Sequence, residues 1–163
     1  MELIHKRNGF TLVELILSLA IMAILAALAA PMFGSNDALQ LDVAKRLLVS
    51  DLEYTQVLAI ANPEDNIALV IEENGTGWHI AQASSQSIPL NDRVTGEALV
   101  KTLGQGPAAP ADQVRIESNA QDNIILFDQN GGLVDFSQEI LISLTIGETN
   151  ALIQISPTTG SIQ

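Results

Sequence analysis

The chain has 163 residues, room for one domain of ordinary size. Nineteen Asp and Glu against seven Lys and Arg give a formal net charge of -12. Because a polyphosphate needs a basic surface, this charge argues against nucleic acid as the main partner. Cysteine is absent, which excludes disulfides, thiolate zinc sites and cysteine nucleophiles. Hydrophobic residues still make up 47% of the chain, so we expect them to be gathered in a block.

The apolar block is at the N-terminus. Residues 10–30 read FTLVELILSLAIMAILAALAA, and Glu14 is their only charge. As a helix they would extend about 31 Å, the hydrocarbon thickness of a bilayer. Lys6 and Arg7 precede the block, whereas the first charges after it are acidic. By the positive-inside rule we expect a single-pass helix that leaves residues 1–9 in the cytoplasm and sends the rest outward.

Two simpler interpretations of the block stay open. A cleaved secretory signal would have a shorter apolar core before a small-residue cleavage site, which the Ala-Leu-Ala-Ala sequence at 27–30 weakly permits. A plain membrane anchor fits the length and the flanking charges but leaves Glu14 unexplained. A charge within the membrane costs about 2.5–3.5 kcal/mol on insertion scales, so its presence usually indicates a function.

The residues around Glu14 favour a third interpretation. A short basic leader ends in Gly9, Phe10 follows, and Glu14 is the fifth residue counted from Phe10. This pattern, KRNGFTLVE, resembles the prepilin signature of type IV pilins and type II secretion pseudopilins. Pro31, near the end of the apolar run, also lies where the helices of such proteins commonly carry a proline.

The resemblance implies that a prepilin peptidase cleaves the bond between Gly9 and Phe10, and that Phe10 is then N-methylated. Gly9 has no side chain, which allows close approach to its backbone. Cleavage leaves an α-amine at the end of an apolar helix. Glu14 is the natural counter-charge for that amine, in its own subunit or in a neighbour during assembly. A Glu14 that reaches the lipid headgroups before assembly is a compatible alternative.

Pro31 and Gly34 interrupt the run, either as a kink in one helix or as a break. The segment 31–62 is expected to be an amphipathic helix that ends before Pro63. One mainly apolar stripe has helical spacing: Leu41, Ala44, Leu48, Leu52, Thr55 and Ala59. A second apolar set lies across the helix: Leu39, Val43, Leu47, Tyr54, Leu58 and Ala61. Since a surface helix needs only one stripe, the second serves either neighbouring subunits or burial on both sides within the domain.

After Pro63 the pattern is that of β-strands. They are expected at 67–71, 78–81, 114–116, 124–127, 140–146 and 151–155, with turns at 73–77, 129–132 and 147–150. Residues 84–113 have loop composition, with a possible short strand at 99–103, and indicate a binding loop or a mobile excursion. The element order predicts an α+β fold in which a long N-terminal pilin-like helix packs on an antiparallel β-sheet or small β-sandwich.

The order of strands and turns in the C-terminal part of the chain narrows the resemblance to one group of such proteins. Its strands and turns are similar to those of the GspH/FimT group of minor pseudopilins and minor pilins. The features that carry this likeness are 47–61, Gly77-Trp78, 124–128, Gly131-Gly132, 140–146 and 153–160. The expected organisation is a prepilin leader at 1–9, a transmembrane helix at 10–30, an amphipathic helix at 31–62 and a periplasmic β domain at 63–163.

No catalytic or metal-binding constellation is evident. His79 lies in an expected strand without Cys, His, Asp or Glu at a ligand-like spacing, so we interpret it as structural. The turn after Asp128 faintly resembles the start of an EF-hand loop but lacks the later ligands. No G-x-S-x-G, P-loop or dinucleotide fingerprint occurs. We therefore expect no enzymatic activity, no cofactor and no metal.

The resemblance implies a minor pseudopilin of a type II secretion system, of the H type. Such a protein would lie among the lipids of the bacterial inner membrane, with its C-terminal domain in the periplasm. At the inner-membrane secretion platform it would join other minor pseudopilins and the major pseudopilin in a pseudopilus that supports export across the outer membrane. In this family the tip subunit usually lacks the glutamate, so Glu14 implies a place just below the tip.

Two other hypotheses remain. A FimT-like minor pilin of a type IV pilus would act in pilus initiation or DNA uptake. The acidic domain weighs against DNA, because Arg93, Lys101 and Arg115 are its only basic residues after Asn62. A membrane-anchored periplasmic enzyme or binding module would owe its N-terminus to chance, and failure of the peptidase to remove residues 1–9 would favour it.

Overall fold

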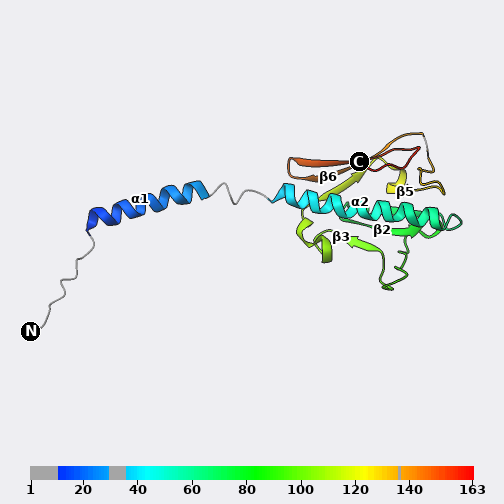
Figure 1. Ribbon diagram of the computed structural model, residues 1–163, viewed down its shortest axis with the longest axis horizontal. Coiled ribbons are helices and arrows are strands. Elements are labelled where there is room, and N and C mark those ends of the chain that lie inside the picture. Colours follow the sequence, from blue (N-terminus) through cyan, green and yellow to red (C-terminus); the bar gives the residue numbers. More distant parts are fainter. Residues whose placement is uncertain (1–10, 30–35, 136) are drawn as a thin grey trace, which may run out of the picture. The chain divides into compact units, whose positions relative to one another are not determined.

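The computed structural model describes residues 11–29, 36–135 and 137–163. The chain divides into two compact units, residues 1–35 and 36–163 (Figure 1). The helices and strands are α1 (Leu12–Ala29), α2 (Asp37–Ala61), β1 (Ile67–Ile71), β2 (Gly77–Gln82), β3 (Val100–Thr102), β4 (Arg115–Ser118), β5 (Ile124–Leu126), β6 (Ile140–Ile146) and β7 (Thr149–Ile155). Short 3-10 helices lie at η2 (Ala83–Ser85), η3 (Gly106–Ala111) and η4 (Gln121–Asn123).

The first unit contributes α1. Measured over the part of the chain that the structure describes, neither α1 nor α2 reaches the length and apolarity of a membrane span. The predicted span at 10–30 stays a prediction. Several predicted features lie outside the described residues: the leader 1–9 with Gly9, the cleavage and methylation site Phe10, and the kink residues Pro31 and Gly34.

The buried face of α2 confirms the predicted stripe. Its buried residues are Leu41, Ala44, Leu48, Leu52, Thr55 and Ala59. The second apolar set is divided: Leu47, Tyr54 and Leu58 are half-buried against the domain's own core, whereas Leu39 is 60% exposed. Burial on both sides within the domain therefore accounts for much of the second set. Val57 and Ile60 are the other large apolar side chains of α2 that are exposed.

The β domain consists of two antiparallel sheets, as the α+β prediction allowed. The first has the order β3-β2-β1-β5 and the second the order β4-β6-β7. The hairpins β1–β2 and β6–β7 are those expected from the turn signals. At their border the Ile116 N–H of β4 donates to the Gly75 carbonyl in the β1–β2 turn at 3.0 Å. Gly75 has φ +66° and no room for a Cβ beside Ile116, so glycine is required there.

The segment 84–113, predicted to have little regular structure, is largely irregular but packs against the domain. The segment contains β3 and η3, and a small ladder joins it to β2. Leu90 N–H donates to the Ile80 carbonyl at 2.8 Å, and Ile80 N–H donates to the Leu99 carbonyl at 3.0 Å. Its Ala108 and Ala111 side chains are fully buried. The edge of β2 that does not pair with β1 offers backbone partners to this segment. The possible strand at 99–103 is confirmed as β3.

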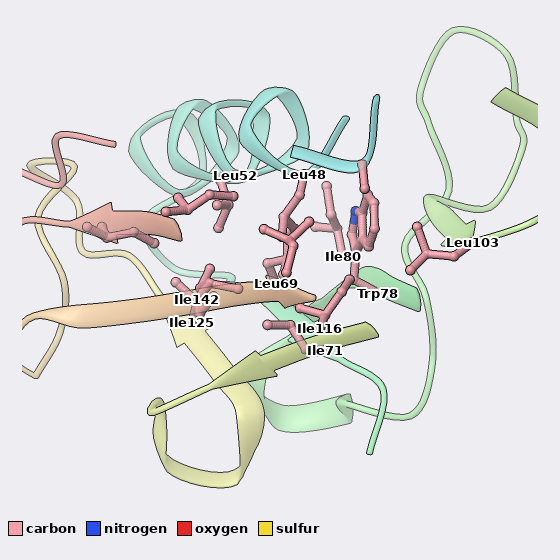
Figure 2. Packing of buried hydrophobic residues seen from close by; sticks show 14 of the residues in the cluster. Leu48, Leu52, Leu69, Ile71, Trp78, Ile80, Leu103, Ile116, Ile125 and Ile142 are labelled. Atoms are coloured by element: carbon pink, nitrogen blue, oxygen red, sulfur yellow. The ribbon is translucent and has the colours of Figure 1, made fainter. Parts of the chain in front are cut away.

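The core lies between α2 and the two sheets (Figure 2). Leu48 and Leu52 of α2 point toward Leu69 of the first sheet and Ile142 of the second. Two side-chain hydrogen bonds also hold α2 in place. Trp78, fully buried in β2, donates its indole Nε1–H to Asp51 Oδ2 at 2.7 Å. The Lys45 ammonium donates to the Leu152 carbonyl of β7 at 2.8 Å. The helix is therefore held to both sheets.

Candidate functional site

The candidate site begins in the first turn of α1. The Glu14 N–H donates to Thr11 Oγ1 at 3.3 Å, so Thr11 caps the helix. Threonine followed three residues later by glutamate is the sequence of a capping box. The capping role of Thr11 was not predicted from the sequence, although the spacing alone indicates it. A carboxylate in the first turn also interacts favourably with the helix dipole.

Glu14 is exposed, and its carbonyl accepts the Ser18 hydroxyl at 2.7 Å, so its backbone groups are engaged within the helix. Among the described residues, no side chain donates a hydrogen bond to its carboxylate. Phe10, whose amine is the predicted partner, lies outside the described residues. The pairing of that amine with Glu14 therefore stays a prediction.

The surface of α1 around Glu14 is mostly apolar. The large apolar side chains from Leu12 to Leu25 are exposed by between 52% and 74%. Soluble monomers rarely expose contiguous apolar patches of more than a few hundred Å², and larger ones usually mark contacts with other proteins or with membranes. Glu14 is the only charged residue of α1.

The β domain shows structural roles for the polar residues that the sequence singled out. The His79 Nε2–H donates to the Gln86 carbonyl at 2.6 Å, and Nδ1 lies 3.6 Å from the Glu72 carboxylate. Asp128 Oδ1 accepts the N–H groups of Asn130 and Gly132 at 2.8 and 2.9 Å, which makes a turn. Within the described ranges, no group of three or more His, Cys, Asp or Glu is placed to hold a metal.

The glycines quoted for the C-terminal resemblance meet at α2. Gln56 donates its side-chain amide to the Gly131 carbonyl at 2.5 Å and to the Gly160 carbonyl at 3.3 Å. Gly160 has φ +61°, and a Cβ there would overlap the Gly131 carbonyl oxygen. Two turns far apart in the sequence are therefore closed against the same helix, which explains why both carry glycine.

The charged surface of the domain is acidic. The pKa of Asp92 is lowered because its carboxylate accepts the N–H groups of Thr95 and Val94. The few cations are dispersed over separate elements. Arg93 donates to Asn62 Oδ1 at 2.9 Å, Arg115 of β4 donates to the Val114 carbonyl at 2.9 Å, and Lys101 lies on β3.

Comparison with known proteins bears on both units. Residues 4–30 match the prokaryotic N-terminal methylation motif. The fold is similar to the type IV minor pilin FimU of Pseudomonas aeruginosa in two crystal forms. The P21 form is 20% identical with TM-score 0.52, covering 76% of this chain and 86% of FimU. The P65 form is 16% identical with TM-score 0.51, covering 75% and 89%. No curated protein matches the chain. The chain thus combines a prepilin-type N-terminal motif with a pilin-like α+β fold.

Proposed function

We propose that the chain is a minor pseudopilin of a type II secretion system. It assembles with other minor pseudopilins and the major pseudopilin into the periplasmic pseudopilus, just below the tip, and supports protein export across the outer membrane. The observation that carries the proposal is Glu14, the single charge of residues 10–30, within the segment 4–30 that matches the N-terminal methylation motif. The protein acts as a structural subunit, without enzymatic activity or cofactor.

Before assembly, the helix at 10–30 lies in the inner membrane with its N-terminus in the cytoplasm and the β domain in the periplasm. Prepilin peptidase removes residues 1–9 by cutting between Gly9 and Phe10, and Phe10 is N-methylated. Moving the helix from lipid into a bundle of apolar helices exchanges one apolar environment for another, so the hydrophobic effect hardly drives assembly. A carboxylate that meets a neighbour's amine supplies the missing specificity and sets the register of the subunits.

The second unit fits a subunit that is carried by its helix. Asp51, Gln56 and Lys45 of α2 are hydrogen-bonded to three different parts of the β domain. A displacement of α2 therefore moves the domain with it. Leu39, Val57 and Ile60 are the large apolar side chains of α2 that stay exposed, and they are available to neighbouring subunits.

A FimT-like minor pilin of a type IV pilus is the second candidate. The likeness of the fold to FimU, a type IV minor pilin, favours it. DNA uptake by direct binding is disfavoured in either case. The net charge is -12, and Arg93 and Arg115 already donate hydrogen bonds within the domain.

The test is a deletion of the gene in the organism that encodes the chain, complemented with the wild type, with Glu14→Ala or with Glu148→Ala. Glu148 is an exposed carboxylate in the β6–β7 turn and serves as the matched control. We expect the deletion and Glu14→Ala to retain exoproteins in the periplasm with surface pili intact, and Glu148→Ala to secrete normally. Normal secretion with missing pili would overturn the secretion role and establish the minor pilin.

A further inference from the structure

Helix α1 carries two polar side chains, and they lie one turn apart. Within Leu12–Ala29 only Glu14 and Ser18 are polar, and every other residue is aliphatic or methionine. Residues four apart in a helix share one face, with about 5–6 Å between their Cβ atoms. Ser18 is therefore the one polar neighbour of Glu14 along α1. The proposed function pairs Glu14 with a neighbouring subunit's α-amine and gives Ser18 no role.

The hydroxyl of Ser18 can act only as an acceptor toward a partner. It donates its proton to the Glu14 carbonyl oxygen at 2.7 Å. Serine within a helix often makes this bond, which satisfies the hydroxyl donor without a partner on another helix. Because a hydroxyl has one proton and two lone pairs, the bond leaves Ser18 Oγ with lone pairs only. On the exposed surface of α1, a hydrogen-bond acceptor thus accompanies the Glu14 carboxylate.

Thr11, just before α1, differs from Ser18 in this respect. Thr11 Oγ1 accepts the Glu14 N–H at 3.3 Å, so one of its lone pairs is used while the hydroxyl keeps its proton. A cationic donor needs a lone pair and is repelled by a proton that points toward it. The hydrogen bonds of the first turns of α1 therefore favour Ser18 over Thr11 as a second acceptor beside Glu14.

The expected ligand has two donors to satisfy. An N-methylated α-amine of Phe10 in a neighbouring subunit is a secondary ammonium, which has two N–H groups. These groups diverge at the tetrahedral angle, and hydrogen bonds weaken when they are bent, so a single carboxylate cannot align with both. An N–H that lacks an acceptor is costly where apolar helices exclude water. A second acceptor beside Glu14 removes that cost.

We propose that Ser18 is a binding residue of the site at Glu14: the α-ammonium of a neighbouring subunit donates one N–H to the Glu14 carboxylate and the other to Ser18 Oγ. This role of Ser18 rests on the proposed function, because it requires the pairing of that amine with Glu14. With Ser18 included, α1 is matched to the two donors of an N-methylated amine and not to its charge alone.

The test is an NMR titration of the full chain, labelled with nitrogen-15, in uncharged maltoside micelles. In the uncleaved chain Phe10 has no free amine, so it does not compete with the probe. The probe is N-methylphenylalanine octylamide, which brings a secondary ammonium into the micelle. The comparison probe is its N,N-dimethyl analogue, a cation with a single N–H. Both are charged at about pH 6, because α-amino groups have pKa values of about 7.7–8.0.

Four variants accompany the wild type. Ser18→Ala removes the hydroxyl, and Ser18→Thr keeps it. Ser18→Ala combined with Ala20→Ser has the composition of the wild type, but its hydroxyl lies on a different face of α1 from Glu14. Glu14→Gln removes the charge and tests the pairing on which the role of Ser18 depends. The amide spectrum of each variant shows directly whether it is folded, and binding is measured from the amide shifts of residues 14–18.

We expect Ser18→Ala and the double variant to bind the secondary ammonium about 3- to 10-fold more weakly than the wild type, and the tertiary ammonium equally well. Ser18→Thr should bind both probes as the wild type does. An equal loss for both probes, or no loss for either, would overturn the role of Ser18 and leave the pairing with Glu14 intact. Unchanged binding by Glu14→Gln, or no saturable shift in the wild type, would contradict that pairing and the role of Ser18 with it.

Discussion

The bond between Asp51 and Trp78 gives the sharpest prediction about what holds α2 to the sheets. Trp78 is fully buried, and its indole N–H has Asp51 Oδ2 as its acceptor at 2.7 Å. Replacement Asp51→Ala leaves a buried donor without a partner, which costs about 1–3 kcal/mol. We expect a loss of about 2 kcal/mol in the free energy of unfolding, roughly a 30-fold change in the ratio of folded to unfolded protein.

Two further variants separate this hydrogen bond from other effects. Asp51→Asn keeps an acceptor oxygen, and we expect it to lose about half as much stability as Asp51→Ala. Glu53→Ala removes an exposed carboxylate two residues away on the same helix and should change stability by less than about 0.5 kcal/mol.

The assay is urea unfolding of the full chain in detergent, followed by tryptophan fluorescence. Trp78 is the only tryptophan, so its emission reports both unfolding and its own burial. The midpoint should fall while the slope with urea stays constant, because the exposed area is unchanged. The reasoning is refuted if Asp51→Ala and Glu53→Ala unfold at the same urea concentration.

The remaining predictions concern two glycine substitutions, cleavage by prepilin peptidase and the stability of the domain at low pH. Gly160→Ala should destabilise the domain by about 2–4 kcal/mol in the same assay, because its Cβ would overlap the Gly131 carbonyl. Gly147→Ala, also at positive φ but with nothing within 4 Å, should lose only about 1–2 kcal/mol, and equal losses would contradict the packing argument. Gly9→Val should leave the chain uncut by prepilin peptidase, whereas the wild type loses residues 1–9, as intact mass would show. Asp92, with its folded pKa lowered, contributes stability that is present at neutral pH and is lost as the pH falls below about 4. Asp92→Asn should therefore flatten the acid limb of a pH–stability curve, and an unchanged limb would contradict this.

Local patterns in the sequence were sufficient to predict the secondary-structure elements and to recognise the N-terminal motif. The buried stripe from Leu41 to Ala59 follows from helical spacing, because residues three and four apart share one face. The hairpins β1–β2 and β6–β7 follow from short turns between apolar runs. Gly9, Phe10 and Glu14 form a signature that is read along the chain, and residues 4–30 match the methylation motif.

Only the tertiary structure decided which strands pair and which side chains meet, because local patterns do not distinguish between possible partners. The sequence shows equivalent short apolar runs at 114–116 and 124–127, yet β4 pairs with β6 and β5 with β1. In the folded domain, the segment 84–113 also pairs with the edge of β2 through β3. It divided the second stripe of α2 between core and surface, and brought Asp51 to Trp78 and Gln56 to Gly160. The physical reason is that hydrophobicity specifies burial but not the partner, since any apolar run can cover any apolar surface. Partners are selected only when loop closure, hydrogen-bond pairing and packing are satisfied together.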